Sequence, residues 1–276
     1  TNYFVYAGVA VAKDGEQVKT GFELIFDNDF NKVNIDDLAK KVVEDTVSKL
    51  GGEPCLTNTY KAILSPNVAA SLLKAYISNA NAEDVQKRSS LFVGKLHQKV
   101  ASKKLTVLDT PLKKNVFTRW FDDEGVATYN KPIIKNGVLE TYLYNLTTAA
   151  KDGVQTTGNG YKAGGKMGIA TTYITVKPGK KSQDELFALV DNGILITDIQ
   201  GLHAGLNAQS GNFSLQSSGF LIENGKKTTP VDLITIGGNL IELFNNVIEV
   251  GGDNEDLVGA ISIPSLVIKS IKVSGK

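Results

Sequence analysis

The sequence predicts an α+β protein made mostly of antiparallel β-sheet, open or curled toward a barrel, with a few amphipathic helices. Hairpin signals recur: Asn136-Gly137 and Asn224-Gly225 each stand between two apolar, strand-like runs, and Asn-Gly is the pair that a type I′ hairpin turn favours. Helical and strand-like segments do not alternate regularly, as they would in a parallel sheet built from βαβ units. Neighbouring strands are therefore expected to pair antiparallel.

The chain opens with a predicted hairpin followed by a helix. Residues 3–12 form an apolar run, Asp14-Gly15 supplies a turn, and residues 18–26 alternate between apolar and polar side chains, which is the period of a half-buried strand. Apolar residues then recur at helical spacing over 35–50, and Asn34 is placed to cap that helix.

The rest of the chain contains weaker element signals. Residues 60–64 predict a short strand, and Ser65-Pro66 predicts an N-cap with proline at the first helical position. A polar stretch occupies 79–88, and 105–108 is another β-like run. The remaining predicted elements are hairpins over 131–144 and 213–229, helices after the capping box at 182–185 and over 239–246, and strands over 261–263 and 266–273.

Composition and charge exclude several function classes. Of 276 residues, 30 are basic and 29 acidic, giving a formal charge of +1, so nothing favours binding to nucleic acid or a membrane surface. No apolar run reaches the roughly 20 residues that a spanning helix needs. A single cysteine fits a reducing compartment. The chain starts at a threonine in a strand-like run, which predicts a fragment with something removed upstream.

The sequence offers no recognisable metal or nucleophile motif. His97 and His203 are 106 positions apart, whereas a zinc protease helix places two histidines within one or two turns. Cys55 has no identifiable basic partner and reads as an inert thiol. Residues 160–166 fit G-x-x-x-x-G-K, but Met167 stands where a phosphate loop needs Ser or Thr. We therefore expect no catalytic residue, no metal and no cofactor.

Three segments could still contact a ligand. Five glycines between 157 and 168 predict a mobile loop, either over a peptide groove or simply at the surface. The acidic run 122–124 flanks a glycine and reads as a solvated turn, with acid–base chemistry as the alternative. His203 lies in a glycine-rich loop, where either a ligand contact or a structural role is open.

Taken together and in order, several segments resemble the PmbA/TldD family. Lys87-Arg88-Ser89-Ser90 also resembles a stretch that follows the family's active-site helix. The segments that carry the resemblance are FDDEGV at 121–126, IIKNGVL at 133–139, TGNG at 157–160, SGNF at 210–213, GFLIENG at 219–225 and ITIGGNL at 234–240.

The resemblance implies that residues 1–276 are the middle and C-terminal region of such a protein, without the family's N-terminal domain. Members are cytoplasmic proteins linked to peptide-antibiotic maturation, antitoxin turnover and modulation of DNA gyrase. The family resemblance implies a heterodimeric metalloprotease. Its TldD-type subunit carries H-E-x-x-x-H on a helix and a later cysteine, and its PmbA-type subunit, also called TldE, lacks them.

This chain departs from the catalytic pattern. Pro66 and Ser71 stand where the two histidines would be, Asn67 replaces the glutamate, and 257–260 contain no cysteine. The resemblance therefore implies a non-catalytic subunit that pairs with a TldD-type chain or with itself and helps hold a peptide. Alternatives are a protease with a site not visible in the sequence, or a protein-binding regulator of gyrase. The residues expected at the peptide groove are Asp123, Glu124, Gly158, Asn159, Gly160 and His203.

Overall fold

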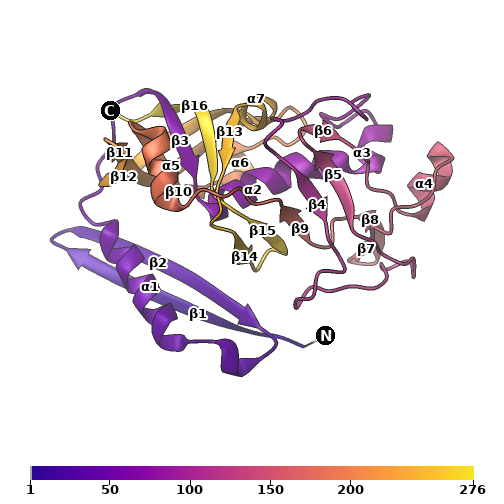
Figure 1. Cartoon of the computed structure of the whole chain (residues 1–276), viewed down its shortest axis with the longest axis horizontal. Helices are drawn as coiled ribbons and strands as arrows, with labels where there is room; N and C mark the ends of the chain where they lie inside the picture. Colours follow the sequence, from indigo (N-terminus) through magenta and orange to yellow (C-terminus); the bar gives the residue numbers. More distant parts are fainter. Residues whose placement is uncertain (1) are drawn as a thin grey trace.

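The computed structural model describes residues 2–276, which form a small N-terminal unit beside a larger body (Figure 1). In the N-terminal unit, strands β1 (Phe4–Asp14) and β2 (Gln17–Asp27) pair antiparallel, and helix α1 (Ile35–Ser48) packs on one face of the pair. A short 3-10 helix, η1 (Phe30–Lys32), joins them. Gly21 permits this packing because a Cβ there would collide with the Thr46 side chain.

The predicted first hairpin and helix are confirmed with one shift in the turn. Asp14 pairs with Gln17, so the two-residue turn is Gly15-Glu16 rather than Asp14-Gly15, and Gly15 takes the positive φ of 56°. The side chain of Asn34 caps α1 by accepting hydrogen bonds from the backbone N–H groups of Asp36 and Asp37.

The first sheet of the body is six-stranded, in the order β12-β11-β10-β3-β16-β13, and β12 also pairs with β16. This extra pairing closes five of the strands into a barrel-like ring, and all pairs except β10–β3 are antiparallel. The predicted architecture is thereby confirmed. The strands are β3 (Asn58–Leu64), β10 (Gly193–Gln200), β11 (Asn212–Glu223), β12 (Lys226–Asn239), β13 (Val247–Val250) and β16 (Leu266–Ser274).

The second sheet runs β14-β15-β9-β4-β5-β6, and a separate two-stranded sheet joins β7 to β8. Only β15–β9 is parallel in the second sheet. The strands are β4 (Val107–Asp109), β5 (Lys131–Lys135), β6 (Val138–Leu139), β7 (Gly160–Ala163), β8 (Lys166–Ile169), β9 (Ile174–Val176), β14 (Glu255–Leu257) and β15 (Ile261–Ile263).

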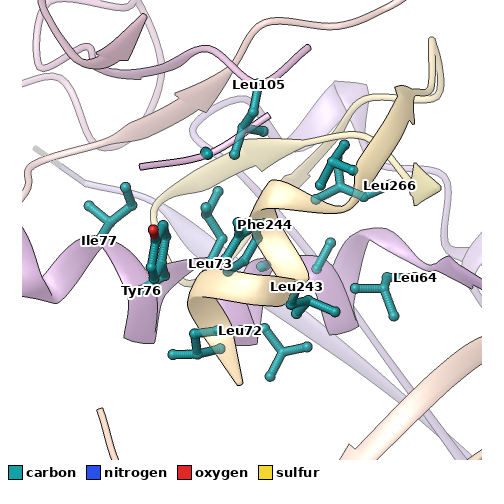
Figure 2. Close-up of a cluster of buried hydrophobic side chains, with 14 of the residues drawn as sticks. Leu64, Leu72, Leu73, Tyr76, Ile77, Leu105, Leu243, Phe244 and Leu266 are labelled. Carbon is teal, nitrogen blue, oxygen red and sulfur yellow. The ribbon is translucent and has the colours of Figure 1, made fainter. Parts of the chain in front are cut away.

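Helix α2 (Pro66–Ile77) is the centre of the main hydrophobic core, which draws side chains from both sheets (Figure 2). The Tyr76 ring stacks on Phe244 of α7 at 4.7 Å between centroids. The other helices are α3 (Ala82–Gln86), α4 (Leu146–Asp152), α5 (Gln183–Val190), α6 (Leu202–Gly205), α7 (Leu240–Asn245) and the 3-10 turn η2 (Ser78–Ala80). Within residues 2–276, none of the helices combines the length and the hydropathy required to cross a bilayer.

Most local predictions are confirmed. Both Asn-Gly pairs are hairpin tips with positive φ at each residue, 49° and 82° at 136–137, and 50° and 70° at 224–225. Ser182 and Glu185 form a complete capping box at the start of α5. Ser65 is the N-cap of α2, but its hydroxyl makes no capping bond.

Three segments predicted as irregular contain regular structure. The polar stretch 79–88 includes α3, which its N-cap Asn81 stabilises. The glycine-rich stretch 157–168, predicted as a mobile loop, has buried residues at 157–160 and then forms the β7–β8 hairpin. The loop expected to hold His203 is helix α6. Short elements of three to five residues give too little periodicity to detect.

Candidate functional site

The acidic turn 121–126 and the glycine-rich segment 157–160 meet at the β7–β8 hairpin. The Asp122 carboxylate accepts a 2.7 Å hydrogen bond from the Gly160 N–H, and that of Asp123 accepts one of 2.8 Å from the Lys162 N–H. Asp122 is only 3% exposed. The solvated-turn interpretation of this acidic run is therefore wrong for Asp122, because its carboxylate anchors a distant backbone segment.

The neighbouring candidates Glu124, Gly158 and Gly160 belong to the same junction. The Glu124 carboxylate accepts a 2.7 Å hydrogen bond from the first N–H of α4, that of Leu146. Gly160 leaves room for Glu124, since a Cβ there would lie 2.7 Å from its side chain. Gly158 combines a φ of 66° with close approach to the Ala127 carbonyl, so only glycine fits without strain.

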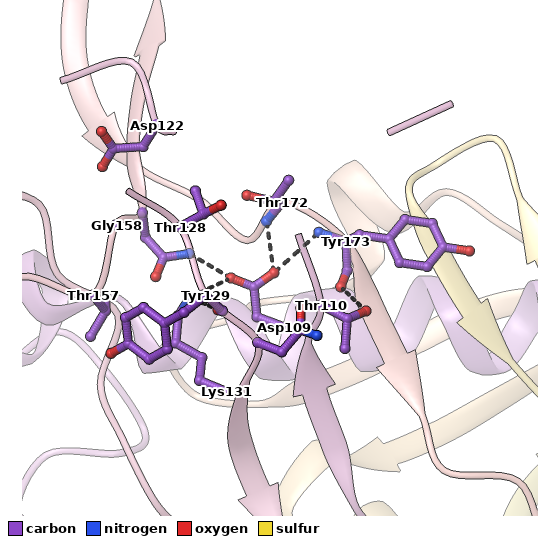
Figure 3. A network of polar contacts seen from close by, with 12 residues as sticks. Asp109, Thr110, Asp122, Thr128, Tyr129, Lys131, Thr157, Gly158, Thr172 and Tyr173 are labelled. Carbon is purple, nitrogen blue, oxygen red and sulfur yellow. Dashed lines mark hydrogen bonds and ion pairs between the residues drawn. The ribbon is translucent and has the colours of Figure 1, made fainter. Parts of the chain in front are cut away.

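A buried ion pair lies next to this junction and is linked to it through Asn159 (Figure 3). Lys131 opens β5 and Asp109 ends β4, and their Nζ and Oδ2 atoms are 3.2 Å apart with both side chains at most 4% exposed. Asn159 donates to the same Oδ2 at 2.7 Å. The other oxygen of Asp109 accepts from the N–H groups of Thr172 and Tyr173 at 3.0 and 3.1 Å.

Burial acts on the Lys131 ammonium. Removal from water lowers the pKa of Lys131, and the nearby Asp109 carboxylate opposes that effect. Lys131 Nζ also donates to the Tyr129 carbonyl at 3.0 Å and lies 4.5 Å from the centre of the Tyr129 ring. The Asn159 Oδ1 atom has no hydrogen-bond partner among the described residues. By contrast, the Asp109 carboxylate, the Lys131 ammonium and the Asn159 amide nitrogen each make at least two polar contacts.

This cluster is suited to holding segments in place rather than to transferring protons. Asp109 and Asp122 are enclosed, and their oxygens are already committed to N–H donors and the Lys131 ammonium. A general acid or base must reach a substrate atom within hydrogen-bond distance. Asp109 and Lys131 were not singled out from the sequence. The available signal was weak: a charged residue directly after an apolar β run.

Helix α2 and the turn between β14 and β15 form a second region of interest. Eight α2 side chains are buried, and the others, on Asn67, Ser71, Lys74 and Ala75, lie on one side of the helix. The Ser71 hydroxyl donates to the Asn67 carbonyl at 3.0 Å. The Lys74 amine lies against Gly259, where a Cβ would collide with its Nζ atom.

These contacts bring together the two segments in which the family resemblance places metal ligands. The helix positions are occupied by Pro66, Asn67 and Ser71, and the turn 257–260 presents a glycine to the Lys74 amine. Among residues 2–276, no three His, Cys, Asp or Glu side chains gather closely enough to hold a metal ion. The residues present therefore do not fit a zinc or similar transition-metal site, which needs imidazole, thiolate or carboxylate ligands.

The histidines and the cysteine lie elsewhere. His203 is exposed on α6, apart from the β7–β8 hairpin that carries the other groove candidates (Figure 1). His97 is exposed in a turn with a φ of 62°. Cys55 is buried beside Tyr60, and that burial raises the pKa of its thiol. None of the three joins the cluster around Asp109.

Among the surface cavities formed by residues 2–276, two are large. One, of about 660 Å³, separates β2 of the N-terminal unit from residues 114–118 of the body. The other, of about 560 Å³, is lined in part by Cys55 and Tyr60. Neither is lined by any of the six residues expected at the peptide groove.

Comparisons with known proteins agree with the resemblance. Residues 57–275 match the model of the PmbA/TldA metallopeptidase C-terminal domain. The Metalloprotease PmbA homolog of Buchnera aphidicola subsp. Acyrthosiphon pisum is 31% identical over 272 residues, which cover 96% of this chain and 57% of that protein. The chain thus spans little more than half the length of this curated relative.

Solved structures share the fold. A proposed modulator of a DNA gyrase from Thermotoga maritima superposes with a TM-score of 0.93 at 32% identity, covering 98% of this chain and 62% of that one. TldE from Thermococcus kodakarensis gives a TM-score of 0.91 at 24% identity, covering 99% and 63%. Because the family model matches most of its length, this chain belongs to the PmbA/TldD metallopeptidase family.

Proposed function

We propose that this chain is the middle and C-terminal region of a PmbA/TldE-type, non-catalytic subunit, which pairs in the cytoplasm with a TldD-type metalloprotease subunit. The complex would act in proteolysis and peptide maturation. One observation carries the proposal: α2 and the 257–260 turn are in contact but offer no metal ligand, only an amine against a glycine. A helix without ligands cannot activate water through a metal.

The structure supports a role in holding an extended peptide. Strands β7 and β8 pair only with each other among the described residues. The outer edge of β7 is occupied by hydrogen bonds with Asp122 and Asp123, so β8 is the strand with a free edge. A free strand edge can accept an extended peptide through backbone hydrogen bonds. Asp122 and Asp123 fix this hairpin to the body by accepting hydrogen bonds from the Gly160 and Lys162 N–H groups, and the Glu124 side chain lies against Gly160. Gly158 and Asn159 precede β7 and hold its start against the body, through the close approach of Gly158 to Ala127 and the hydrogen bond from Asn159 to Asp109. His203 would contact a peptide only if the groove extended to α6.

A second candidate function is regulation of another protein. The Thermotoga maritima and Bacteroides thetaiotaomicron neighbours, both 32% identical to this chain, are described as proposed modulators of DNA gyrase. This function would need a protein-binding surface rather than a peptide groove. Binding of gyrase by the isolated full-length protein, without a TldD-type chain, would favour it.

The proposal is tested by producing the full-length protein with a TldD-type chain from the same organism. We expect the two to co-purify and to cleave unstructured peptides. Replacing the glutamate of the partner's H-E-x-x-x-H by glutamine should abolish cleavage, because that carboxylate assists the metal-bound water. The single variants C55S and H97A of this chain should fold and cleave normally, because Cys55 and His97 lie outside both the polar cluster around Asp109 and the proposed peptide groove. Cleavage that survives the partner's substitution but is lost in either folded variant would instead identify this chain as the protease.

A further inference from the structure

Lys74 is the one charged residue of helix α2, and no described residue forms an ion pair with it. The non-buried positions Asn67, Ser71 and Lys74 are spaced by four and three residues, so they share one side of α2. None of the ion pairs or side-chain hydrogen bonds within residues 2–276 involves the Lys74 amine. Its contact is with the backbone of Gly259, a residue that is itself exposed.

This placement is costly for an ammonium group. Partial burial lowers the pKa of Lys74, and no nearby charge contributes in either direction. A desolvated cation without a partner is unfavourable unless it loses its proton or gains an anion. By comparison, Lys131 is more deeply buried and has the Asp109 carboxylate at 3.2 Å. Lys74 lacks such a partner within the described chain, yet it remains open to solvent on the turn side.

From this geometry we infer that Lys74, with Asn67 and Ser71 on the same side of α2, forms a binding site for a peptide carboxylate. The inference rests on the proposed peptide-holding role, which it makes more specific. A single ammonium flanked by an amide and a hydroxyl provides one charge and a few hydrogen-bonding groups. That set matches one carboxylate, whereas phosphate is usually held by several cationic or backbone donors.

The carboxylate could be the C-terminus of a peptide or an Asp or Glu side chain. Both would supply the missing negative charge at the amine. The ammonium would then be stabilised in the bound state, so the Lys74 pKa should rise when the carboxylate binds. Removing the charge-assisted contact should weaken binding by about 10- to 100-fold in Kd.

The test uses the full-length protein with ¹³C-labelled lysine side chains, observed by NMR. The probes are N-acetyl-dialanine and its C-terminal amide, and N-acetyl-Ala-Glu-Ala amide and the matching Gln peptide. The Lys74 signal is assigned by its loss in K74R. We expect a saturable shift and a raised Lys74 pKa with one of the two carboxylate probes, and neither effect with the amide or Gln counterpart. The responding probe identifies the source of the carboxylate.

Variants and a control make the outcome decisive. The variants K74M and K74R both lack the Lys74 signal, so their binding of the responding probe is measured by calorimetry. K74M should weaken binding about 10- to 100-fold, and K74R should retain it because arginine keeps the charge. K87M should bind normally, since Lys87 is exposed and paired with Glu83. An unchanged Lys74 signal with every carboxylate probe, or an equal response to the neutral peptides, would overturn the inference. Co-purification with the TldD-type chain is measured separately, so that a failed pairing counts against the proposed function and not against this site.

Discussion

Asn159 donates a 2.7 Å hydrogen bond to the buried Asp109 carboxylate across fifty residues of sequence. This contact joins the TGNG segment, which lies beneath the β7–β8 hairpin, to the end of β4 in the second sheet. The same carboxylate is paired with Lys131 and capped by two backbone N–H groups. The position of the proposed peptide edge therefore depends on a buried polar cluster, and changes in that cluster can be measured as stability.

Replacing Asn159 by alanine should destabilise the fold by about 2–3 kcal/mol. The side chain is 1% exposed and donates to both Asp109 and the Ala170 carbonyl, so its loss leaves buried acceptors without donors. Urea unfolding of the purified protein measures the effect. N28A is the matched control, because Asn28 is exposed and its side chain makes no hydrogen bond within the described chain. Equal stability of the two variants would contradict the role assigned to Asn159.

Replacing Lys131 by methionine should cost about 3–5 kcal/mol, because it leaves the Asp109 carboxylate buried without its cation. The double variant D109N/K131M should be less destabilised than the sum of the two single variants, since it removes both charges. A double-mutant cycle from urea unfolding checks this. Simple additivity would show that the 3.2 Å contact between the two side chains carries no coupling energy.

Gly158 and Gly153 offer a matched pair of substitutions. Both have a φ of 66°, but a Cβ at Gly158 would lie 2.9 Å from the Ala127 carbonyl, whereas Gly153 faces open space. G153A should cost about 1 kcal/mol for the backbone conformation alone, and G158A should cost clearly more, roughly 2–3 kcal/mol. Thermal unfolding compares them. If G158A costs no more than G153A, the close approach is not a constraint.

Replacing Glu255 by glutamine should stabilise the protein at neutral pH but not at acidic pH. Burial raises the pKa of Glu255, with Lys41 opposing and Glu23 and Asp253 adding to the effect. The folded state then holds the proton more tightly than the unfolded state, so stability is lost as pH rises through the folded pKa. E255Q avoids that loss and should have a higher Tm than the wild type at pH 7, with the difference vanishing below pH 4.5, the ordinary glutamate value.

The control for this experiment is E44Q, which changes an exposed carboxylate on α1. It should shift Tm little at either pH. A constant difference between E255Q and the wild type from pH 4 to pH 7 would show that the variant acts through packing and not through ionisation.

Features encoded by adjacent residues could be predicted from the sequence. The Asn136-Gly137 and Asn224-Gly225 turns, the Asn34 cap and the capping box at Ser182 each depend on residues within a few positions of one another. The contacts that build the candidate site depend on distant pairs. Nothing near Asp109 in the sequence indicates Asn159 or Lys131, and nothing near Lys74 indicates Gly259.

The shortest helices could not be predicted from the spacing of apolar residues. Helix α6 has four residues and α3 has five, so neither shows a full helical repeat. The β7–β8 hairpin was obscured by its glycines, which predict a flexible loop but here occupy the turn at Gly164-Gly165 with φ values of 54° and 86°. The same residues that allow sharp turns also permit disorder, so composition alone does not distinguish the two.

The central claim is that this chain contributes no metal ligand to the complex. The most direct measurement is the metal content of the full-length protein, by elemental analysis, alone and bound to a TldD-type chain. The account predicts far less than one equivalent of transition metal on the isolated protein and about one per heterodimer, held by the partner's H-E-x-x-x-H helix. One tightly bound metal ion per isolated chain, removed only by a chelator, would contradict it.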